Sequence, residues 1–342
     1  MAYKYHIRRK VLAKYYKGHS VNDVWLEAAS DLKMKSKNEL PIPSRCGNTV
    51  ETLHVNFTIE APHERFLFCR KPNISIAVAL SELICILKGS NDAKIMNYWN
   101  KNLPDFAGTD KKYYGAYGFR LKKEFGINQL KRVYNILKSN IETRQAVLLI
   151  WKPSKDLPKE DGKPRNNDIP CNIVSMLKIR DNKLFWSQIM RSNDIFLGTP
   201  YNFIQFTFLQ EILAGWLKVK IGEYTLFCDS LHYYESNFNI DLYKPIPNEK
   251  IENNDYFSET YDETMSYVKY IYSVMKKIAY KKLSEDGLSK LFQKKELPTR
   301  WENIILILIA YAAKEYGYTS LKEKLIADIK NPAYIYLWRN HF

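Results

Sequence analysis

Apolar side chains recur every three or four residues between Val21 and Ala29, and this spacing predicts a helix over residues 1 to about 35. The Pro- and Gly-containing segment 41–48 follows and predicts a turn-rich loop. Leu53–Ile59 then alternates apolar and polar side chains, as a half-buried strand does. The chain is therefore expected to open with a helix, a loop and a strand.

Residues Ser75–Lys88 are nearly all apolar and are followed by Gly89, which predicts a buried helix that ends at this glycine. Its one carboxylate, Glu82, lies in the middle of the apolar stretch. A buried charge is costly unless it is paired or hydrogen-bonded. Glu82 is therefore expected either to face a polar cavity, which we favour, or to cap a neighbouring element.

The middle of the chain alternates helical and extended patterns. Residues 127–139 predict an amphipathic helix, Ala146–Trp151 a buried strand, and the Pro-, Lys- and Asp-rich segment 152–167 a surface loop. Ile173–Ile179 and Leu184–Ile189 predict two strands joined by a tight turn.

The last third of the chain changes character. Phe203–Leu217 predicts an apolar helix and Gly222–Cys228 a strand, but beyond residue 245 helical patterns dominate, as in Tyr261–Leu283 and Trp301–Tyr316. We therefore expect a mixed α/β domain, with its N-terminal helix, over residues 1–245, and a helical C-terminal extension packed on it over residues 246–342.

Composition supports a folded globular enzyme, with 46% hydrophobic and 26% charged residues. The longest apolar run, Ile304–Ala313, is shorter than the roughly 18 residues that a membrane span needs. The N-terminus has basic residues but no apolar core after them, so a secretory signal is not predicted and a cytoplasmic location is. The five cysteines show neither disulfide nor zinc-site spacing, and no metal is expected.

The formal net charge of +15 predicts an electric field that attracts anions. Nucleic acid, nucleotides and polyglutamylated cofactors all satisfy this, and an AT-rich genome would produce a similar excess of lysine. The charge alone does not choose among these explanations.

Cys171 is the main candidate for chemistry, because it ends the loop 168–171 just before a predicted strand, where functional side chains are often presented. A lone cysteine is more often structural. Two downstream segments change that interpretation, namely Met190–Asn202, which reads MRSNDIFLGTPYN, and 230–235, which reads SLHYYE.

Pro170-Cys171, the Arg-Ser-x-Asp stretch with its Leu-Gly-x-Pro-Tyr-Asn continuation, and the later His-x-Tyr pair occur in the order and spacing of the thymidylate synthase family, which this chain resembles over residues 40 to 240. Upstream, the Glu82 helix, Tyr117-Gly118 and Thr143-Arg144-Gln145 resemble further elements of that family. The resemblance implies an α/β (α+β) fold with a large mixed sheet flanked by helices, assembled as a two-fold homodimer.

The resemblance also implies a reaction. Carbon 5 of a pyrimidine is a poor nucleophile until a thiolate adds to carbon 6, and Cys171 would be that thiolate. The one-carbon donor would be 5,10-methylenetetrahydrofolate, and the other substrate a pyrimidine nucleotide monophosphate.

Substrate contacts follow from the same resemblance. Arg191 and Ser192 would bind the phosphate, and Arg144 would reach it across the dimer interface; surface salt bridges are the alternative for the arginines. Asn202 offers a donor and an acceptor that match the imide edge of uracil, which favours dUMP, although an ordinary asparagine at a helix start is the alternative.

His232 and Tyr234 lie two residues apart on one predicted strand face and would hold a sugar hydroxyl. Asp194 would bind the pterin of the folate, Tyr117 would help remove the proton from carbon 5, and Glu82 would organise water near the base and the folate. Plain packing or capping is the alternative for each.

Departures from the family pattern bear on the product. Gln145 replaces a second arginine, Asn172 stands where the best-known members have His, Met190 replaces Gln, and segment 337–342 has no recognisable counterpart of the family's apolar tail. Because water exclusion helps decide between methyl and hydroxymethyl products, hydroxymethylation of dUMP, dCMP or CMP is the alternative reaction. A non-catalytic protein that binds nucleotides or nucleic acid is a remoter alternative, since no RNA-binding signature occurs.

Overall fold

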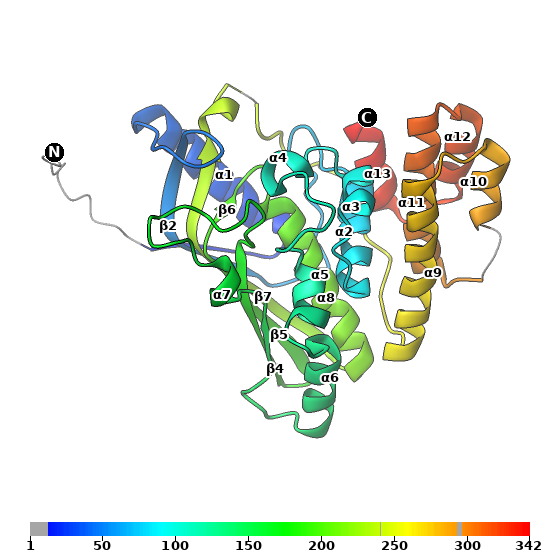
Figure 1. Ribbon diagram of the computed structural model, residues 1–342, viewed down its shortest axis with the longest axis horizontal. Coiled ribbons are helices and arrows are strands. Elements are labelled where there is room, and N and C mark those ends of the chain that lie inside the picture. Colours follow the sequence, from blue (N-terminus) through cyan, green and yellow to red (C-terminus); the bar gives the residue numbers. More distant parts are fainter. Residues whose placement is uncertain (1–12, 240, 293–295) are drawn as a thin grey trace, which may run out of the picture.

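The computed structural model describes residues 13–239, 241–292 and 296–342, and it contains a seven-stranded mixed sheet with the order β1-β2-β7-β5-β4-β3 (Figure 1). The short strand β6 lies off this path and pairs with β7. The strands are β1 (Lys14–Gly18), β2 (Thr49–Ile59), β3 (Val147–Leu149), β4 (Asn172–Arg180), β5 (Lys183–Met190), β6 (Asn193–Asp194) and β7 (Lys220–Tyr234). The large mixed sheet expected from the sequence is confirmed.

The long strand β7 is the centre of the sheet. It is antiparallel to β2 along nearly its whole length and parallel to β5 on its other side. β4 follows β5 as an antiparallel hairpin partner, and β6 pairs with the last part of β7. The beginning of β4 and the ends of β5 and β7 therefore lie at one end of the sheet.

Helices flank the sheet and form a second layer beyond it (Figure 1). Those before residue 245 are α1 (Val21–Asn38), α2 (Ile76–Lys88), α3 (Ala93–Trp99), α4 (Leu103–Ala107), α5 (Tyr117–Phe119), a π-helical turn (Arg120–Glu124), α6 (Gln129–Ser139), α7 (Pro153–Asp156), α8 (Thr199–Leu217) and a 3-10 turn (Glu235–Asn237). The central helix α8 packs against β5 and β7 on one side and α2 on the other.

Local signals start and end the predicted helices as expected. The Ser75 hydroxyl accepts a hydrogen bond from the backbone N–H of Val78 at the start of α2, and Gly89 ends that helix in the left-handed region at φ 73°. Asn128 caps α6 in the same way. These helices match their predicted ranges because their caps are encoded within a few residues of each end.

The predicted helix over residues 1 to 35 is wrong in its first part. Residues 1–12 lie outside the described part of the chain, Lys14–Gly18 forms strand β1, and the helix begins at Val21 and runs to Asn38. A capping box formed by Ser20 and Asp23 starts the helix there. The strand before it is stabilised by parallel pairing with β2, a long-range interaction that periodicity does not reveal.

Two further predictions need correction. Within Ala146–Trp151 only Val147–Leu149 forms a strand, the edge strand β3, and Val147 is 42% exposed because no element among the described residues covers its outward side chain. The segment 152–167 is largely a surface loop but contains α7, whose buried Asp156 forms an ion pair with Arg120 with an N–O distance of 2.7 Å.

The helical character of the C-terminal part is confirmed. It comprises α9 (Tyr261–Tyr280), α10 (Glu285–Phe292), α11 (Thr299–Tyr316), α12 (Thr319–Asp328) and α13 (Pro332–His341). Helices α9, α11 and α13 pack against α2, and one apolar core runs continuously from the sheet through α2 into these helices. Among the residues described, no helix combines the length and apolarity that crossing a bilayer requires.

Candidate active site

Cys171 directly precedes β4, and just after it an irregularity between Asn172 and Val174 interrupts the pairing with β5. Arg191 follows the end of β5, and its backbone N–H donates to the Cys171 carbonyl over 3.0 Å. The Arg191 guanidinium donates to the carbonyl of Pro170 over 3.1 Å and lies 3.7 Å from the Cys171 sulfur. None of these partners is a carboxylate, so Arg191 is held beside the thiol rather than in a surface salt bridge.

The electrostatics of the thiol have two opposing parts. Burial raises the pKa of Cys171, and the guanidinium groups of Arg191 and Arg45 act in the opposite direction. A buried thiol with cationic neighbours is the environment in which cysteine can serve as a nucleophile once its proton has left.

Glu82 projects from the middle of α2 toward two amide side chains. Gln205 on α8 donates to its carboxylate over 2.6 Å, and Asn100, which follows α3, donates over 3.3 Å. Burial raises the pKa of Glu82 to about 7, although the hydrogen bonds from the two amides act in the opposite direction. At neutral pH this carboxyl group can therefore both hold and release a proton.

Tyr117 lies in the short helix α5, close enough to Cys171 and Glu82 for their charges to influence it. Burial is the main cause that raises the pKa of Tyr117, and a hydrogen bond from Asn172 opposes it. The next residue, Gly118, packs against the backbone of α2, where a Cβ atom would stand 2.6 Å from the Cα of Ile86. Glycine is required there for α5 to approach α2 this closely.

Ser192, Asp194, His232 and Tyr234 are brought together by the pairing of β6 with β7. The Ser192 hydroxyl is 3.3 Å from Nδ1 of His232, and the His232 and Tyr234 rings meet edge to face at 5.2 Å. Burial lowers the pKa of His232, with Asp194 opposing. The imidazole is therefore suited to hydrogen bonding as a neutral ring.

Asp194 is almost fully buried, and one of its oxygens is unsatisfied. Oδ1 accepts hydrogen bonds from the backbone N–H groups of Phe196, over 2.7 Å, and Leu197. Oδ2 is buried without a hydrogen-bond partner among the described residues. Burial raises the pKa of Asp194, while His232 and the backbone donors oppose the shift. An orphaned buried acceptor of this kind is a binding position for an N–H donor from a ligand.

Asn202 lies in the first turn of α8, and its side chain bonds to Asn172, Asn193 and the Gly198 carbonyl. An asparagine that only caps a helix would bond to the helix backbone alone. Asn202 also bonds to Asn172, the residue after Cys171, and so connects the start of α8 to the beginning of β4.

A family comparison adds to this geometry. The model of the thymidylate synthase family matches residues 43–255. The chain belongs to the thymidylate synthase family. The family match covers strands β2 to β7, Cys171 and the elements around it; it leaves out β1 and ends before α9.

Individual relatives carry two kinds of name. The chain is 34% identical over 196 residues to a deoxyuridylate hydroxymethyltransferase of Bacillus phage SP01, covering 54% of this chain and 50% of that protein. It is 33% identical over 132 residues to a putative thymidylate synthase of Methanothermobacter thermautotrophicus (39% and 56%), and 28% identical over 179 residues to a thymidylate synthase of Francisella tularensis subsp. holarctica (48% and 63%). The chain spans about half the length of the curated relatives it matches.

Arg144 stands apart from the other predicted residues of this family member. It lies exposed in the loop between α6 and β3, and its guanidinium makes no hydrogen bond or ion pair with another described residue. Gln145 beside it is also exposed. The role of Arg144 therefore stays a prediction that depends on a second subunit.

Sequence reasoning missed several residues around the thiol. Arg45, in the loop between α1 and β2, influences the Cys171 pKa, and it donates to the carbonyl of Phe106 over 3.0 Å. Asp168 accepts from the backbone N–H of Gly115 over 2.7 Å, and burial raises its pKa to about 6. An arginine inside a Ser- and Gly-containing turn was the available signal for Arg45; nothing local marked Asp168.

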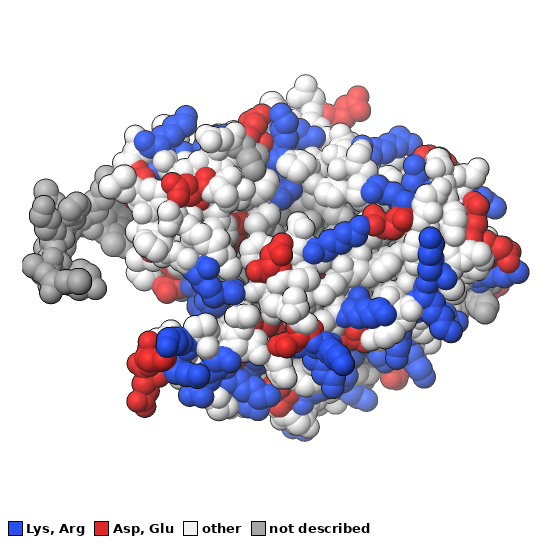
Figure 2. Space-filling view, turned by 45° about the horizontal axis from the view of Figure 1, so that its top comes forward, with Lys and Arg blue, Asp and Glu red and all other residues white. Residues whose placement is uncertain are grey.

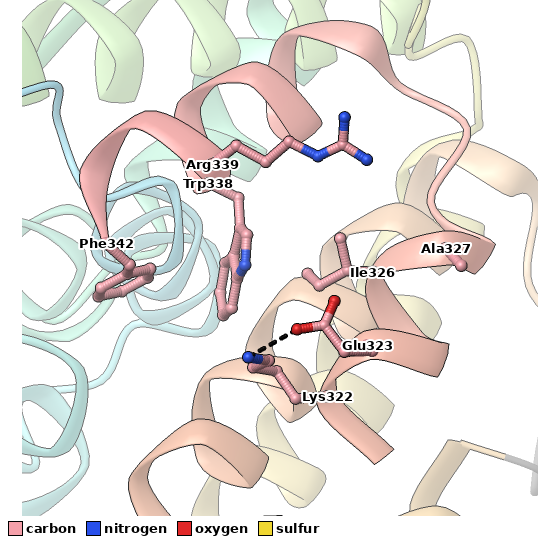
Figure 3. A pocket seen from close by; sticks show the side chains of 7 residues that line it. All are labelled: Lys322, Glu323, Ile326, Ala327, Trp338, Arg339 and Phe342. Carbon is pink, nitrogen blue, oxygen red and sulfur yellow. Dashed lines mark ion pairs between the residues drawn. The ribbon is translucent and has the colours of Figure 1, made fainter. Parts of the chain in front are cut away.

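A separate pocket of about 260 Å³ lies between α12 and α13 of the extension (Figure 3). The residues that line it are Lys322, Glu323, Ile326, Ala327, Trp338, Arg339 and Phe342. None of them belongs to the predicted site, and the Lys322 ammonium is paired with Glu323 over 2.7 Å. Within the described part of the chain, no group of His, Cys, Asp or Glu is arranged to hold a metal.

Proposed function

We propose that this chain transfers a one-carbon unit from 5,10-methylenetetrahydrofolate to carbon 5 of a pyrimidine nucleotide, with dUMP as the favoured substrate and methylation as the outcome. The observation that carries the proposal is the Cys171 thiol beside the Arg191 guanidinium, 3.7 Å away, at the end of the sheet where Ser192, His232 and Tyr234 also gather. This combination supplies a nucleophile, a cation for a phosphate and hydrogen-bonding groups for a sugar.

Cys171 begins the reaction. Its thiolate adds to carbon 6 of the pyrimidine, forming a C–S bond and placing the electron pair of the 5,6 double bond on carbon 5 and oxygen 4. Carbon 5 is then nucleophilic and accepts the one-carbon unit. After the carbon 5 proton leaves, the bond between the one-carbon unit and the folate nitrogen would break, giving an exocyclic methylene and releasing tetrahydrofolate. Hydride addition to that methylene would give the methyl group, re-form the 5,6 double bond and expel the Cys171 thiolate, so the enzyme is restored.

Arg191 and Ser192 bind the nucleotide phosphate in this proposal, and Arg45 adds a third donor from its loop. Guanidinium groups bind phosphate oxygens through paired hydrogen bonds. His232 and Tyr234 bind the sugar hydroxyl from β7. In this proposal the arginines both bind the phosphate and lower the pKa of the Cys171 thiol, and a bound phosphate would neutralise part of their positive charge.

Asp194 fits the folate, because its Oδ2 is a buried acceptor without a partner among the described residues and a pterin presents N–H donors. When bound, the folate supplies the one-carbon unit and, for methylation, the hydride that reduces it. Glu82 and Tyr117 handle the proton of carbon 5 in this proposal; Glu82 is suited to it since its pKa of about 7 lets it exchange a proton at neutral pH.

Hydroxymethylation by the same Cys171 adduct is the second candidate. The observation in its favour is that relatives from Bacillus phage SP01 and Pseudomonas phage M6, 34% and 31% identical to this chain, carry the name deoxyuridylate hydroxymethyltransferase. In that reaction, water rather than hydride would complete the transferred group.

We further propose that the chain works in the cytoplasm as a homodimer that joins through the outward face of the sheet. Met176, Phe185 and Phe227 lie on that face and are only partly buried, and Val147 and Leu149 at its edge are exposed. A second copy would cover these apolar side chains, and in such a dimer Arg144, which is exposed beside β3, would serve the partner's site. The division of the chain near residue 245 stays a prediction.

Product analysis tests the proposed reaction. The protein is incubated with 5,10-methylenetetrahydrofolate and dUMP, dCMP or CMP, and the nucleotide products are weighed by mass spectrometry while dihydrofolate is followed by absorbance. Methylated dUMP formed together with dihydrofolate is the expected result. A hydroxymethyl product without dihydrofolate would refute methylation and leave hydroxymethylation.

Release of the carbon 5 proton separates both reactions from simple binding. The wild type is expected to release label from 5-tritiated dUMP, and Cys171→Ala is expected to release none. Absence of release from the wild type would instead favour a protein that binds nucleotide or nucleic acid without catalysis.

The surface charge bears on that alternative. Figure 2 shows Lys and Arg side chains over much of one face, with Asp and Glu side chains among them. This mixed distribution differs from the continuous basic stripe that is typical of nucleic-acid-binding proteins.

A further inference from the structure

Buried amide side chains form a continuous hydrogen-bonded chain that ends at Asn202. The indole N–H of Trp186 and the hydroxyl of Ser175 both donate to Oε1 of Gln188, over 3.2 and 2.5 Å. Nε2 of Gln188 donates to Oδ1 of Asn172 over 2.5 Å, and Nδ2 of Asn172 donates to Oδ1 of Asn202 over 3.2 Å. We call Trp186, Gln188, Asn172 and Asn202 the amide relay.

The far end of the relay is fixed by the start of α8. Nδ2 of Asn202 donates to Oδ1 of Asn193 over 3.2 Å and to the backbone carbonyl of Gly198 over 3.0 Å. Asn202 is 7% exposed, and the three preceding members of the relay are 1% exposed or less. Water is therefore largely excluded from the relay.

The two ends of the relay determine which way every amide points. An indole N–H can only donate, so the oxygen of Gln188 must face Trp186. A backbone carbonyl can only accept, so the nitrogen of Asn202 must face Gly198. Both constraints give the same orientation to the intervening Asn172, and turning any one amide would place two donors or two acceptors against each other.

The sheet register brings the relay together. Trp186 and Gln188 are two residues apart on the inward face of β5, and Gln188 lies directly opposite Ser175 on β4. Asn172 is the first residue of β4 and directly follows Cys171. The relay thus connects the interior of the sheet to the residue beside the nucleophile.

We propose that Trp186, Gln188 and Asn172 are positioning residues that lock the Asn202 amide in one orientation and so make the site prefer a uracil ring to a cytosine ring. This inference rests on the proposed function, because it concerns the nucleotide that Cys171 attacks.

The chemistry of the two rings explains the preference. Uracil carries an N–H donor at position 3 and an acceptor oxygen at position 4, whereas cytosine carries an acceptor nitrogen at position 3 and an amino donor at position 4. In the locked orientation, both N–H groups of Asn202 are used by Asn193 and Gly198, and its oxygen keeps a free lone pair. That oxygen can accept from N3 of uracil, while it would repel N3 of cytosine.

Reversing the relay from a distance provides the test, and the variant is Gln188→Glu. At about pH 5.5 the new carboxylic acid is protonated, still donates to Asn172 and keeps the original direction of the relay. At about pH 8.5 the ionised side chain only accepts, so Asn172 turns its nitrogen toward it and its oxygen toward Asn202. Asn202 then turns as well and gives up its hydrogen bond to the Gly198 carbonyl, which is weaker than the bonds that an ionised carboxylate accepts. The dissociation constants of dUMP and dCMP are measured by calorimetry at both pH values.

We expect the preference of Gln188→Glu for dUMP over dCMP to fall about 100-fold from the lower to the higher pH, since the contact to N3 changes sign for each of the two nucleotides. The wild type should keep its preference within about threefold. Other titrating groups, among them Cys171, Tyr117 and Glu82, are common to both proteins, and both nucleotides carry the same phosphate, so these contributions cancel in the ratio.

A second pair of variants keeps the test decisive if Gln188→Glu does not fold. Gln188→Met removes the polarity of the relay and should lower the preference about tenfold without pH dependence. Gln210→Met is the matched control, since Gln210 is an equally buried glutamine that donates to the carbonyls of Leu184 and Gly222 outside the relay. It should keep the wild-type preference.

The outcomes separate the two proposals. Wild-type protein that binds dUMP, together with an unchanged preference in both Gln188 variants, would overturn the role of the relay and leave the proposed function standing. Wild-type protein that binds neither nucleotide would overturn both.

Discussion

Replacing Glu82 by glutamine should change how the stability of the protein depends on pH. Burial raises the pKa of this carboxyl group from 4.5 to about 7. The folded pKa is thus higher than the unfolded one, so ionisation of Glu82 favours the unfolded chain. Its contribution to stability is fully present below about pH 4.5 and is lost as the pH rises through about 7.

The size of the effect follows from that shift. Raising the pKa from 4.5 to about 7 corresponds to about 3 kcal/mol between the two protonation states. Most of this difference, about 2 to 3 kcal/mol, falls between about pH 5 and pH 8. Glu82→Gln cannot ionise and avoids this loss. Its new amide nitrogen can donate to Oε1 of Gln205 once the Gln205 amide turns over, because in the wild type Nε2 of Gln205 faces the carboxylate and Oε1 has no partner among the described residues.

Urea unfolding at about pH 5 and pH 8, at one protein concentration, measures the difference in the free energy of unfolding. Relative to the wild type, Glu82→Gln should gain about 2 to 3 kcal/mol on going to the higher pH. Glu160→Gln, which removes an exposed carboxylate from the loop before β4, should follow the wild type. An equal difference between Glu82→Gln and the wild type at both pH values would refute the reasoning.

Three further changes test the site and its dimer. Mixing inactive Cys171→Ala with inactive Arg144→Ala, after unfolding and refolding together, should restore about a quarter of wild-type activity, because half of the dimers are mixed and each has one intact site; no recovery would place Arg144 in its own subunit's site, and an active Arg144→Ala would place it outside any site. Arg45→Ala should weaken dUMP binding about tenfold by calorimetry with little change in melting temperature, since its exposed guanidinium acts on the ligand; unchanged binding would remove Arg45 from the site. Gly118→Ala should lower the free energy of unfolding by about 1 to 3 kcal/mol in urea, because its Cβ would stand 2.6 Å from the Cα of Ile86; unchanged stability would contradict the close approach of α5 to α2.

The fold was predictable from sequence where the signals are local. Helix α2 could be placed because Ser75 and Gly89 stand at its ends and the residues between them are apolar. Strand β1 could not, since its five residues have no distinctive periodicity and depend on pairing with β2, some forty residues further along the chain. The edge strand β3 was predicted to be buried because Ala146–Trp151 is apolar, but the described residues leave Val147 exposed.

The site divides in a similar way. Cys171, Arg191 and His232 could be predicted because they belong to motifs that occur in a fixed order along the sequence. The structure brings the elements that carry them to one end of the sheet. Trp186 and Gln188 carry no motif and acquire their relation to Asn202 only through the register of β4 and β5. Residues that act through another side chain are therefore hidden from sequence reading until the strands have been paired.

The position of α2 has a consequence for how the protein unfolds. This helix carries Glu82 and is packed between α8 on one side and α9, α11 and α13 on the other, within one continuous core. Detaching roughly the last hundred residues would expose α2, whose side chains are almost all apolar, to water. The site around Glu82 is therefore expected to unfold when the C-terminal helices detach. Calorimetric melting should accordingly show one cooperative transition, in which enzymatic activity and the C-terminal helices disappear at the same temperature.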